Sequence, residues 1–300
     1  MGKIGLIVDS SSGFTRKEIE DKGFGFIPLN IIVNGKVYRA GVDINSKEVY
    51  EKMSDKNIKM GTSTATGESI IRAFDKVLEN YDEAIFIGLS HKFSGNINAV
   101  KNVAQNNSKY KNKIHIYDSE YCSPWLSFYF KEFEKLIMEY DDVNEIMRIL
   151  DLPKKYICGF LTPGDIWWFY NGGRITKLQY MMGSLMKINP ILTVADGEIK
   201  KDQLSRARTQ EKTLNKMGDL VLEVINKIKK ENLKFKIVVV KSSIEELTNK
   251  AADFIKNKLN ISNEDIVKLE LSSEQASHLG PGSFGFGTFV TLEELIKKGK

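Results

Sequence analysis

Short apolar runs alternate with segments of helical spacing along the first half of the chain. Residues 84–89 form one apolar run with the length of a buried strand, and residues 3–8 and 113–117 form two others. Behind the run at 84–89, Ile97, Val100 and Ala104 recur at helical spacing. Strands that alternate with helices predict right-handed crossovers and a largely parallel sheet. A ligand crevice is then expected at the carboxyl ends of those strands.

Hairpin signals occur on both sides of a break at 151–153. Asn34-Gly35 and Asp196-Gly197 each predict a tight turn between two strands. Hairpins mixed with crossovers predict a mixed sheet in the second half. The hydroxyl-rich stretch 61–67 and the glycine-rich stretch 280–287 are predicted to be loops. The elements expected after the break are strands at 156–161, 188–194, 235–240, 266–271 and 288–291, and helices at 164–170, 177–185, 209–230 and 243–258.

These patterns predict an α/β protein of two domains. The first, residues 1–152, would carry a mainly parallel sheet, and the second, residues 153–300, a mixed sheet. A chain of 300 residues with 42% hydrophobic residues has the size and composition of such a protein.

Composition excludes several classes of function. Lys and Arg exceed Asp and Glu by only 44 to 39, so the balanced charge gives little support to nucleic-acid binding. Two cysteines without CxxC spacing and three histidines argue against a metal site or a disulfide framework. The longest apolar runs fall short of a membrane span, and the N-terminal run is too short for a secretory signal. We therefore predict a cytoplasmic protein.

The junction between strand 84–89 and the next helix carries Ser94 and Gly95. A serine and a glycine at a strand-to-helix turn can offer a hydroxyl and backbone N–H groups to an anion, near the positive end of the helix dipole. Serine is also a preferred helix N-cap, whatever the protein binds. For Ser94 alone, capping is the stronger of the two interpretations.

Two further loops contain polar groups suited to an anion. Thr62 and Ser63 are read equally well as turn residues and as ligand-binding hydroxyls. Gly172 and Gly173 permit close backbone approach, and Arg174 beside them has the planar fork that matches a carboxylate or phosphate. The plain alternative for Arg174 is an exposed side chain after a turn.

His278 precedes the glycine-rich stretch and is expected in a loop, where it would bind or protonate an anion near neutral pH. With Ser94, it also suggests a nucleophile and base, although nothing in the sequence fixes the geometry of a triad. Abundant Phe and Met at 160–186 and 284–289 are read first as core, and second as the wall of a lipid tunnel.

Taken in order, these loops resemble those of the DegV family over nearly the whole chain. Each loop motif alone is weak evidence for the family, but the order and spacing of all the motifs together are specific. One difference is Asn96, which stands where the family usually has Thr after Ser-Gly. The segments that carry the resemblance are Asp9 to Ser12, Tyr38 to Asp43, Thr62-Ser63, Ser94-Gly95, Asp118-Ser119 with Ser123, Gly172 to Ile175, Pro190-Ile191, and His278 to Gly282.

The resemblance implies a three-layer α/β/α domain with a mainly parallel sheet and a two-layer α/β domain with a mixed sheet. It also implies one long-chain fatty acid held between the two, with no other cofactor and no metal. The acyl carboxylate would be presented to an ATP-dependent fatty-acid kinase, and the chain itself would not be an enzyme. The residues that it places at the carboxylate are Thr62, Ser63, Ser94, Gly95, Arg174 and His278.

Partners follow from the same resemblance. Arg206 and Arg208 match a basic stretch of the family and would dock an acidic partner surface, although a solvated helix start explains them equally well. No nucleic acid is expected. No transmembrane segment is expected either, and transient contact with a membrane surface is compatible with the sequence. The alternative function is a serine-based hydrolase or acyltransferase that acts on acyl substrates.

Overall fold

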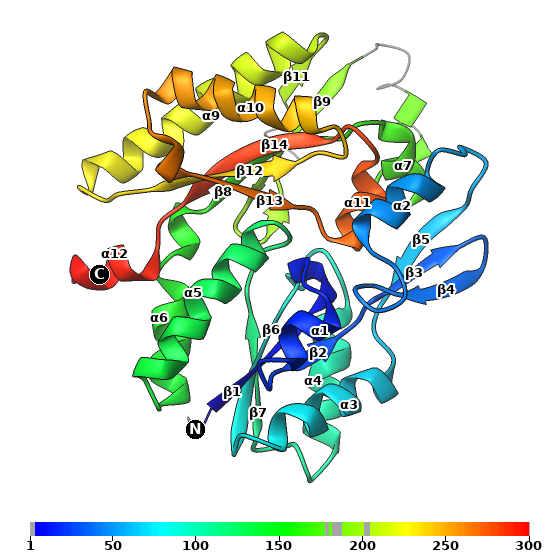
Figure 1. Ribbon diagram of the computed structural model, residues 1–300, viewed down its shortest axis with the longest axis vertical. Coiled ribbons are helices and arrows are strands. Elements are labelled where there is room, and N and C mark those ends of the chain that lie inside the picture. Colours follow the sequence, from blue (N-terminus) through cyan, green and yellow to red (C-terminus); the bar gives the residue numbers. More distant parts are fainter. Residues whose placement is uncertain (1–3, 178–179, 182–187, 201–204, 300) are drawn as a thin grey trace.

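A computed structural model describes residues 4–177, 180–181, 188–200 and 205–299 (Figure 1). It shows an α/β protein with one parallel and one mixed large sheet, as the hydrophobic pattern predicted, and a third, small sheet that the pattern did not predict. Part of the helix predicted at 177–185 falls outside the described residues. Among the described residues, no helix is long and apolar enough to cross a membrane.

The first sheet is parallel, in the order β2-β1-β6-β7. Alternate residues of β1 and β6 face opposite sides, so Ile7 and Phe86 belong to one core cluster and Leu6 to another. Helices α3 and α4 cover the first side and α1, α5 and α6 the second, which gives three layers. The strands are β1 (Ile4–Asp9), β2 (Gly25–Ile27), β6 (Glu83–Gly88) and β7 (Ile114–Asp118). The helices are α1 (Arg16–Glu20), α3 (Gly67–Leu78), α4 (Asn96–Asn106), α5 (Trp125–Glu139) and α6 (Val143–Asp151).

The second sheet is mixed, in the order β10-β9-β8-β14-β12-β13, with β11 paired to β9. Phe160 and Val239 face α9 and α10, which cover one side only, and Leu161 and Val238 face the first sheet's layers. Its strands are β8 (Cys158–Thr162), β9 (Asn189–Ala195), β10 (Glu198–Ile199), β11 (Ser205–Ala207), β12 (Lys236–Lys241), β13 (Ile266–Glu270) and β14 (Phe284–Phe289). The two covering helices are α9 (Gln210–Lys230) and α10 (Glu245–Leu259).

A small antiparallel sheet, in the order β4-β3-β5, lies beside the two large ones (Figure 1). Asn34 and Gly35 both have positive φ, 49° and 82°, which is the conformation that a two-residue hairpin requires. The sheet packs on α2, α7 and α11 through a shared cluster that includes Trp168 and Ala276. Its strands are β3 (Asn30–Val33), β4 (Lys36–Arg39) and β5 (Met60–Ser63), and the helices are α2 (Ser46–Lys52), α7 (Ile166–Asn171) and α11 (Ser273–Leu279).

Three local predictions were wrong. Part of the predicted loop 61–67 is strand β5, because its backbone pairs with β3 despite its hydroxyl-rich composition. The second half of the glycine-rich stretch begins β14, a central strand in which Gly287 lets the ring of Trp125 and the neighbouring strand approach closely. Residues 273–279 form α11, so His278 lies in the last turn of a helix rather than in a glycine loop. The described residues also form helix α12 (Leu292–Lys297) and the short helices η1 (Ser10–Ser12), η2 (Lys154–Tyr156) and η4 (Asn263–Asp265).

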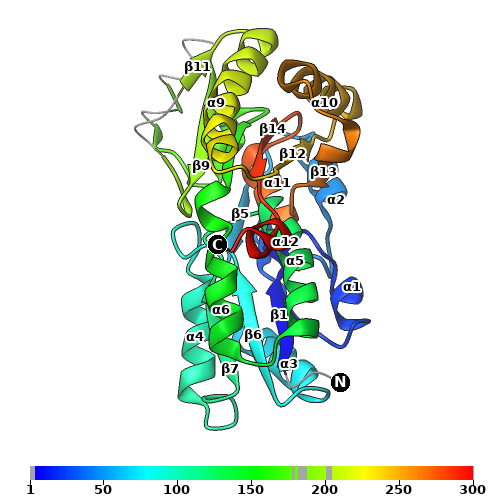
Figure 2. The same cartoon turned by 90° about the vertical axis from the view of Figure 1, so that its left-hand side faces the viewer.

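One hydrophobic cluster runs from the first large sheet to the second. It contains Leu6 and Ile87 from the first sheet, Trp125 from α5, and Leu192 and Val240 from the second sheet. Figure 2 shows the elongated molecule from the side, with α5 and α6 beside the first sheet and α9 and α10 at the opposite end. The two sheets are therefore joined by a continuous core, and the cavity described next opens within their junction.

Candidate ligand-binding site

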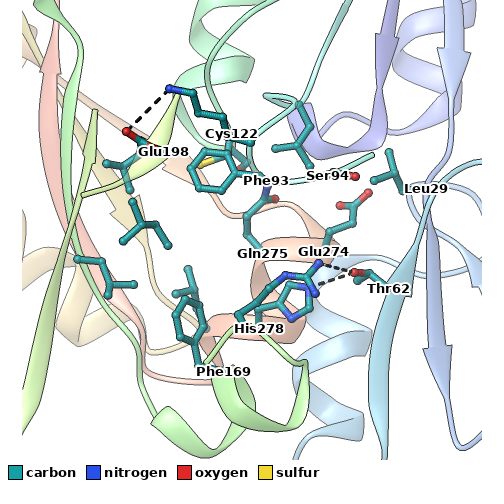
Figure 3. Close-up of a pocket in the computed structure, with 18 of the residues that line it drawn as sticks. Leu29, Thr62, Phe93, Ser94, Cys122, Phe169, Glu198, Glu274, Gln275 and His278 are labelled. Atoms are coloured by element: carbon teal, nitrogen blue, oxygen red, sulfur yellow. Dashed lines mark hydrogen bonds and ion pairs between the residues drawn. The ribbon is translucent and has the colours of Figure 1, made fainter. Parts of the chain in front are cut away.

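A cavity of about 620 Å³ lies where the carboxyl ends of the first sheet meet the uncovered face of the second. Its volume is within the range of small-molecule sites. Figure 3 shows Thr62, His278 and Glu274 toward one end and Glu198 toward the other. The lining residues are Leu29, Thr62, Ser63, Thr64, Leu89, Lys92, Phe93, Ser94, Gly95, Cys122, Ser123, Leu161, Phe169, Arg174, Leu192, Val194, Glu198, Ile199, Glu274, Gln275, His278 and Leu279.

All six residues proposed for the carboxylate line this one cavity, although they come from four separate segments of the chain. Thr62, near the end of β5, contacts two of the other polar side chains at this end of the cavity. Its Oγ1 lies 3.1 Å from Nε2 of His278 and accepts a hydrogen bond of 3.2 Å from Nη2 of Arg174. Arg174 also donates to the carbonyl of Gly172 at 2.9 Å, which fixes the guanidinium beside the threonine. Ser63 and Gly95 complete the set.

His278 is buried, with 8% of its surface exposed. Burial lowers its pKa to about 3, and the nearby charge of Arg174 acts in the same direction. The imidazole is therefore neutral at pH 7, contrary to the expectation that it would titrate near neutrality. Nε2 of the neutral ring contacts Thr62, and Nδ1 has no hydrogen-bond partner among the described residues.

Ser94 lies in the turn between β6 and α4. The N-cap position of α4 is Gly95, and no side chain caps the helix, so Ser94 is not the cap that its residue type suggested. Its Oγ instead accepts a hydrogen bond of 3.2 Å from the backbone N–H of Asn96. The hydroxyl proton remains free to point into the cavity, at the positive end of the helix dipole.

Asn96 is fully buried and joins three segments around the headgroup end. Its Oδ1 accepts a hydrogen bond of 3.1 Å from the N–H of Ala65, and its Nδ2 donates to Oδ2 of Asp9 at 3.1 Å. Oδ2 of Asp9 also accepts from the N–H of Leu89, at 3.1 Å. This carboxamide can both accept and donate, and it thereby fixes the loops that carry Thr62 and Ser94 relative to β1.

Glu274 lines the same end of the cavity, and the sequence reasoning missed it. It is 3% exposed and lies one helical turn before His278 on α11. Ser10 donates a hydrogen bond to Oε1, and burial raises the pKa of the carboxyl. A signal for the helix was present, because Ser272 and Gln275 have the spacing of a capping box, and the N–H of Gln275 donates to Oγ of Ser272 at 3.4 Å.

Apolar side chains form much of the wall between the two ends of the cavity. Leu29, Leu89 and Phe93 follow strands of the first sheet, Leu161 lies on β8 and Phe169 on α7. Phe169 lines the cavity, whereas Phe160, Phe284, Phe286 and Phe289 are buried in the core clusters, so the aromatic segments are mainly core, as their first interpretation had it. At the far end, Lys92 and Glu198 form an ion pair of 3.8 Å between the β6–α4 turn and β10. The cavity thus has a polar end, an apolar middle and one charged pair at its far end.

The described residues form neither a serine nucleophile paired with a histidine base nor a metal site. Nε2 of His278 contacts Thr62, and among the described residues His278 makes no hydrogen bond with Ser94, so these contacts do not assemble a serine nucleophile with its base. Within the described ranges, no group of three His, Cys, Asp or Glu residues has the geometry to hold a metal ion. Arg206, on β11, and Arg208, just after it, are exposed and do not line the cavity.

Comparison with known proteins identifies the family. The family model described as "Uncharacterised protein, DegV family" matches residues 3–291. A DegV domain-containing protein of Clostridium acetobutylicum is 30% identical over 295 residues, which are 98% of this chain and 100% of the relative. The same fold occurs in a stearic acid-binding protein from Eubacterium ventriosum, with a TM-score of 0.84, 22% identity and coverage of 98% and 99% of the two chains.

A second solved structure, a DegV family protein from Eubacterium eligens loaded with heptadecanoic acid, has a TM-score of 0.76 and 16% identity over 96% of this chain and 99% of its own. At these identities the structures establish the shared fold, while the family model and the Clostridium relative establish the relationship in sequence. The resemblance seen in the loops is therefore confirmed, and the chain belongs to the DegV family.

Proposed function

We propose that the chain binds one long-chain fatty acid in this cavity, with the carboxylate at Thr62, Ser94, Arg174 and His278 and the alkyl chain along the apolar wall. The observation that carries the proposal is the distribution of polarity: hydrogen-bonding groups gather at one end of a cavity whose middle is apolar. The fatty acids in the related stearic acid-binding and heptadecanoic acid-loaded proteins support the same ligand class.

The energetics of such a ligand fit the cavity. Each methylene removed from water contributes about 0.8 kcal/mol, so an apolar wall binds a long chain without specific contacts. A carboxylate moved out of water needs several donors in compensation. The guanidinium of Arg174, the hydroxyls of Thr62 and Ser94 and the backbone N–H groups at the start of α4 supply them. Ser63 and Gly95 complete this headgroup site.

We further propose that the chain is a non-catalytic subunit that presents the acyl carboxylate to an ATP-dependent fatty-acid kinase. The sequence has no phosphate-binding loop of its own, so the phosphoryl donor would be held by the partner. Arg206 and Arg208 would contact an acidic surface of that kinase. Both side chains are exposed and lie outside the cavity, so docking and ligand binding are separable by mutation.

Lipid extraction tests the binding step. The purified protein, examined by native mass spectrometry and then extracted, is expected to carry one fatty acid per chain or to take up one when it is added. A protein that stays empty in excess fatty acid would overturn the proposal. For the hydrolase alternative, the discriminating result is turnover of acyl esters by the protein alone that is lost in Ser94→Ala.

A coupled assay tests the presentation step. With a kinase that accepts the loaded protein, the double variant Arg206→Glu, Arg208→Glu is expected to lower formation of acyl phosphate at least tenfold while its lipid content stays at the wild-type level. Because both residues lie outside the cavity, a loss of lipid together with turnover would contradict separate docking and binding surfaces.

A further inference from the structure

Two buried carboxyl groups lie at the headgroup end: Glu274, 3% exposed, lines the cavity, and Asp9, 0% exposed, lies behind the lining and binds Nδ2 of Asn96. A third carboxyl group, that of the ligand, would join them if the function proposed above is correct. Three carboxyl groups in one poorly solvated site cannot all stay ionised, because each negative charge raises the pKa of its neighbours. One of the three groups must therefore take up a proton or leave the site.

The hydrogen bonds show which protein carboxyl is suited to the proton. Asp9 is surrounded by donors: the N–H of Ser11 at 3.2 Å, the N–H of Leu89 at 3.1 Å and Nδ2 of Asn96 at 3.1 Å, together with the hydroxyl of Ser11. Such a set requires acceptor oxygens and thus the carboxylate form. Glu274 has fewer donors: Ser10 donates to Oε1, the hydroxyl of Ser272 also acts to lower its pKa, and Oε2 has no hydrogen-bond partner among the described residues.

The carboxyl group of Glu274 points toward the same end of the cavity as Ser94 and Thr62 (Figure 3). A neutral carboxylic acid keeps one donor, which can lie on Oε2 while Oε1 continues to accept from Ser10. Resting on the proposed function, we propose that Glu274 binds the acyl carboxylate as a neutral acid that donates from Oε2, so that each fatty acid enters the cavity together with one proton.

Among the described residues around α11, the one nearby base is the carboxylate of Asp9, which already accepts four hydrogen bonds; burial raises its pKa to about 6, so above pH 6.5 it stays mainly ionised. Three neighbours of α11 are uncharged: Ser10 of η1, which follows Asp9, Thr62 of β5 and Asn30 of β3. The segment after α7 contributes the cation Arg174, and α11 itself contributes His278, whose pKa of about 3 keeps it neutral. α2 contributes Val49, Met53 and Tyr50, and the phenol of Tyr50 is neutral because burial raises its pKa to about 12. Burial likewise raises the pKa of Glu274 in the protein without ligand, and a bound carboxylate would raise it further.

Calorimetric titration with palmitate, in monomeric dilute form, tests the inference. Binding is measured from pH 6.5 to 9 in pairs of buffers with different enthalpies of ionisation, which reports protons taken up. The wild type is expected to take up about one proton per fatty acid, and its affinity should fall by about tenfold per pH unit over the range in which Glu274 is ionised in the free protein. Glu274→Gln keeps a donor at this position and should bind with no net proton uptake.

Glu132→Gln is the matched control, because Glu132 is a buried glutamate on α5 outside the cavity, and it should keep the wild-type uptake. Infrared difference spectra give a readout that does not depend on folding of a variant: palmitate should add the carbonyl band of a protonated carboxyl group to the wild type. Binding without proton uptake, at constant affinity, would overturn the inference and leave the proposed function intact. Failure to bind palmitate at every pH would overturn the proposed function itself.

Discussion

Gly172 lies against the ring of His278. A Cβ atom on Gly172 would be 2.2 Å from Nδ1 of the imidazole, far inside van der Waals contact. The absence of a side chain in the turn after α7 thus allows the histidine ring to reach Thr62. The glycine pair before Arg174 therefore acts on the headgroup site in two ways: its backbone carbonyl binds the guanidinium, and its missing side chain makes room for the imidazole.

Gly172→Ala is expected to displace the ring of His278 and break its contact with Thr62. Loss of one hydrogen bond in the site should weaken fatty-acid binding by about tenfold, measured as the Kd of a fluorescent fatty acid. Gly67→Ala is the matched control, since a Cβ there meets no atom within 4 Å and the residue begins α3. Unchanged affinity in Gly172→Ala would show that the position of the ring does not matter to the ligand.

Thr62→Ala combined with Ser94→Ala should reduce retention of lipid during purification while the fold persists. Each hydroxyl that contacts a charged group contributes about 1.5 to 3 kcal/mol, so the double variant should lose at least about a hundredfold in affinity. Lipid content by mass spectrometry is the measurement, with exposed Ser108→Ala as the control. Full lipid occupancy in the double variant would remove both residues from the headgroup site.

His278 makes stability depend on pH. Its pKa falls from 6.5 to about 3 on folding, so the stability that it contributes is complete above pH 6.5 and is lost as the pH falls toward 3. Between pH 6.5 and 5 this loss amounts to about 1.5 kcal/mol.

Urea unfolding of delipidated protein at the two pH values should therefore show a smaller decrease in the free energy of unfolding for His278→Gln than for the wild type. His115→Gln serves as the control, because His115 is less buried and contacts Glu83 at 2.7 Å. Identical pH profiles for wild type and His278→Gln would contradict a neutral buried imidazole.

Lys92 and Glu198 are expected to limit the length of the bound acyl chain. Both side chains are about 40% exposed, so their pairing contributes little to stability, and the cavity can be extended there at small cost. Lys92→Ala should shift the preference of the protein toward longer chains in a competition among saturated acids. The exposed Lys111→Ala should keep the wild-type preference. An unchanged profile in Lys92→Ala would place the end of the acyl chain elsewhere.

Much of the fold could be predicted from periodicity. The parallel strands, the Asn34-Gly35 hairpin and the long helix that Thr209 caps all follow local rules that the sequence displays. The first four residues of β14 were missed, although a strand was predicted at 288–291, because glycines in a strand look like a loop until the side chain that needs their space is known. Here that side chain is Trp125, more than 150 residues earlier in the chain.

Residues that line the cavity could be predicted where their chemistry was unusual for the segment, as at Thr62 and Arg174. Glu274 was missed because a glutamate in a helical segment is ordinarily a solvated residue. Its role depends on tertiary placement beside Ser10, 264 positions away in the sequence. The contact between His278 and Thr62 likewise arises from packing of α11 against β5, which no local pattern reports.

Trp125 shows how the two sheets depend on each other. Its ring occupies the space above Gly159 and Gly287 of the second sheet, yet its helix covers the first. Cutting the chain near residue 152 would uncover the apolar face of one fragment and leave an empty groove in the other. The two halves therefore share one buried core, and we expect the protein to unfold in a single cooperative transition rather than half by half.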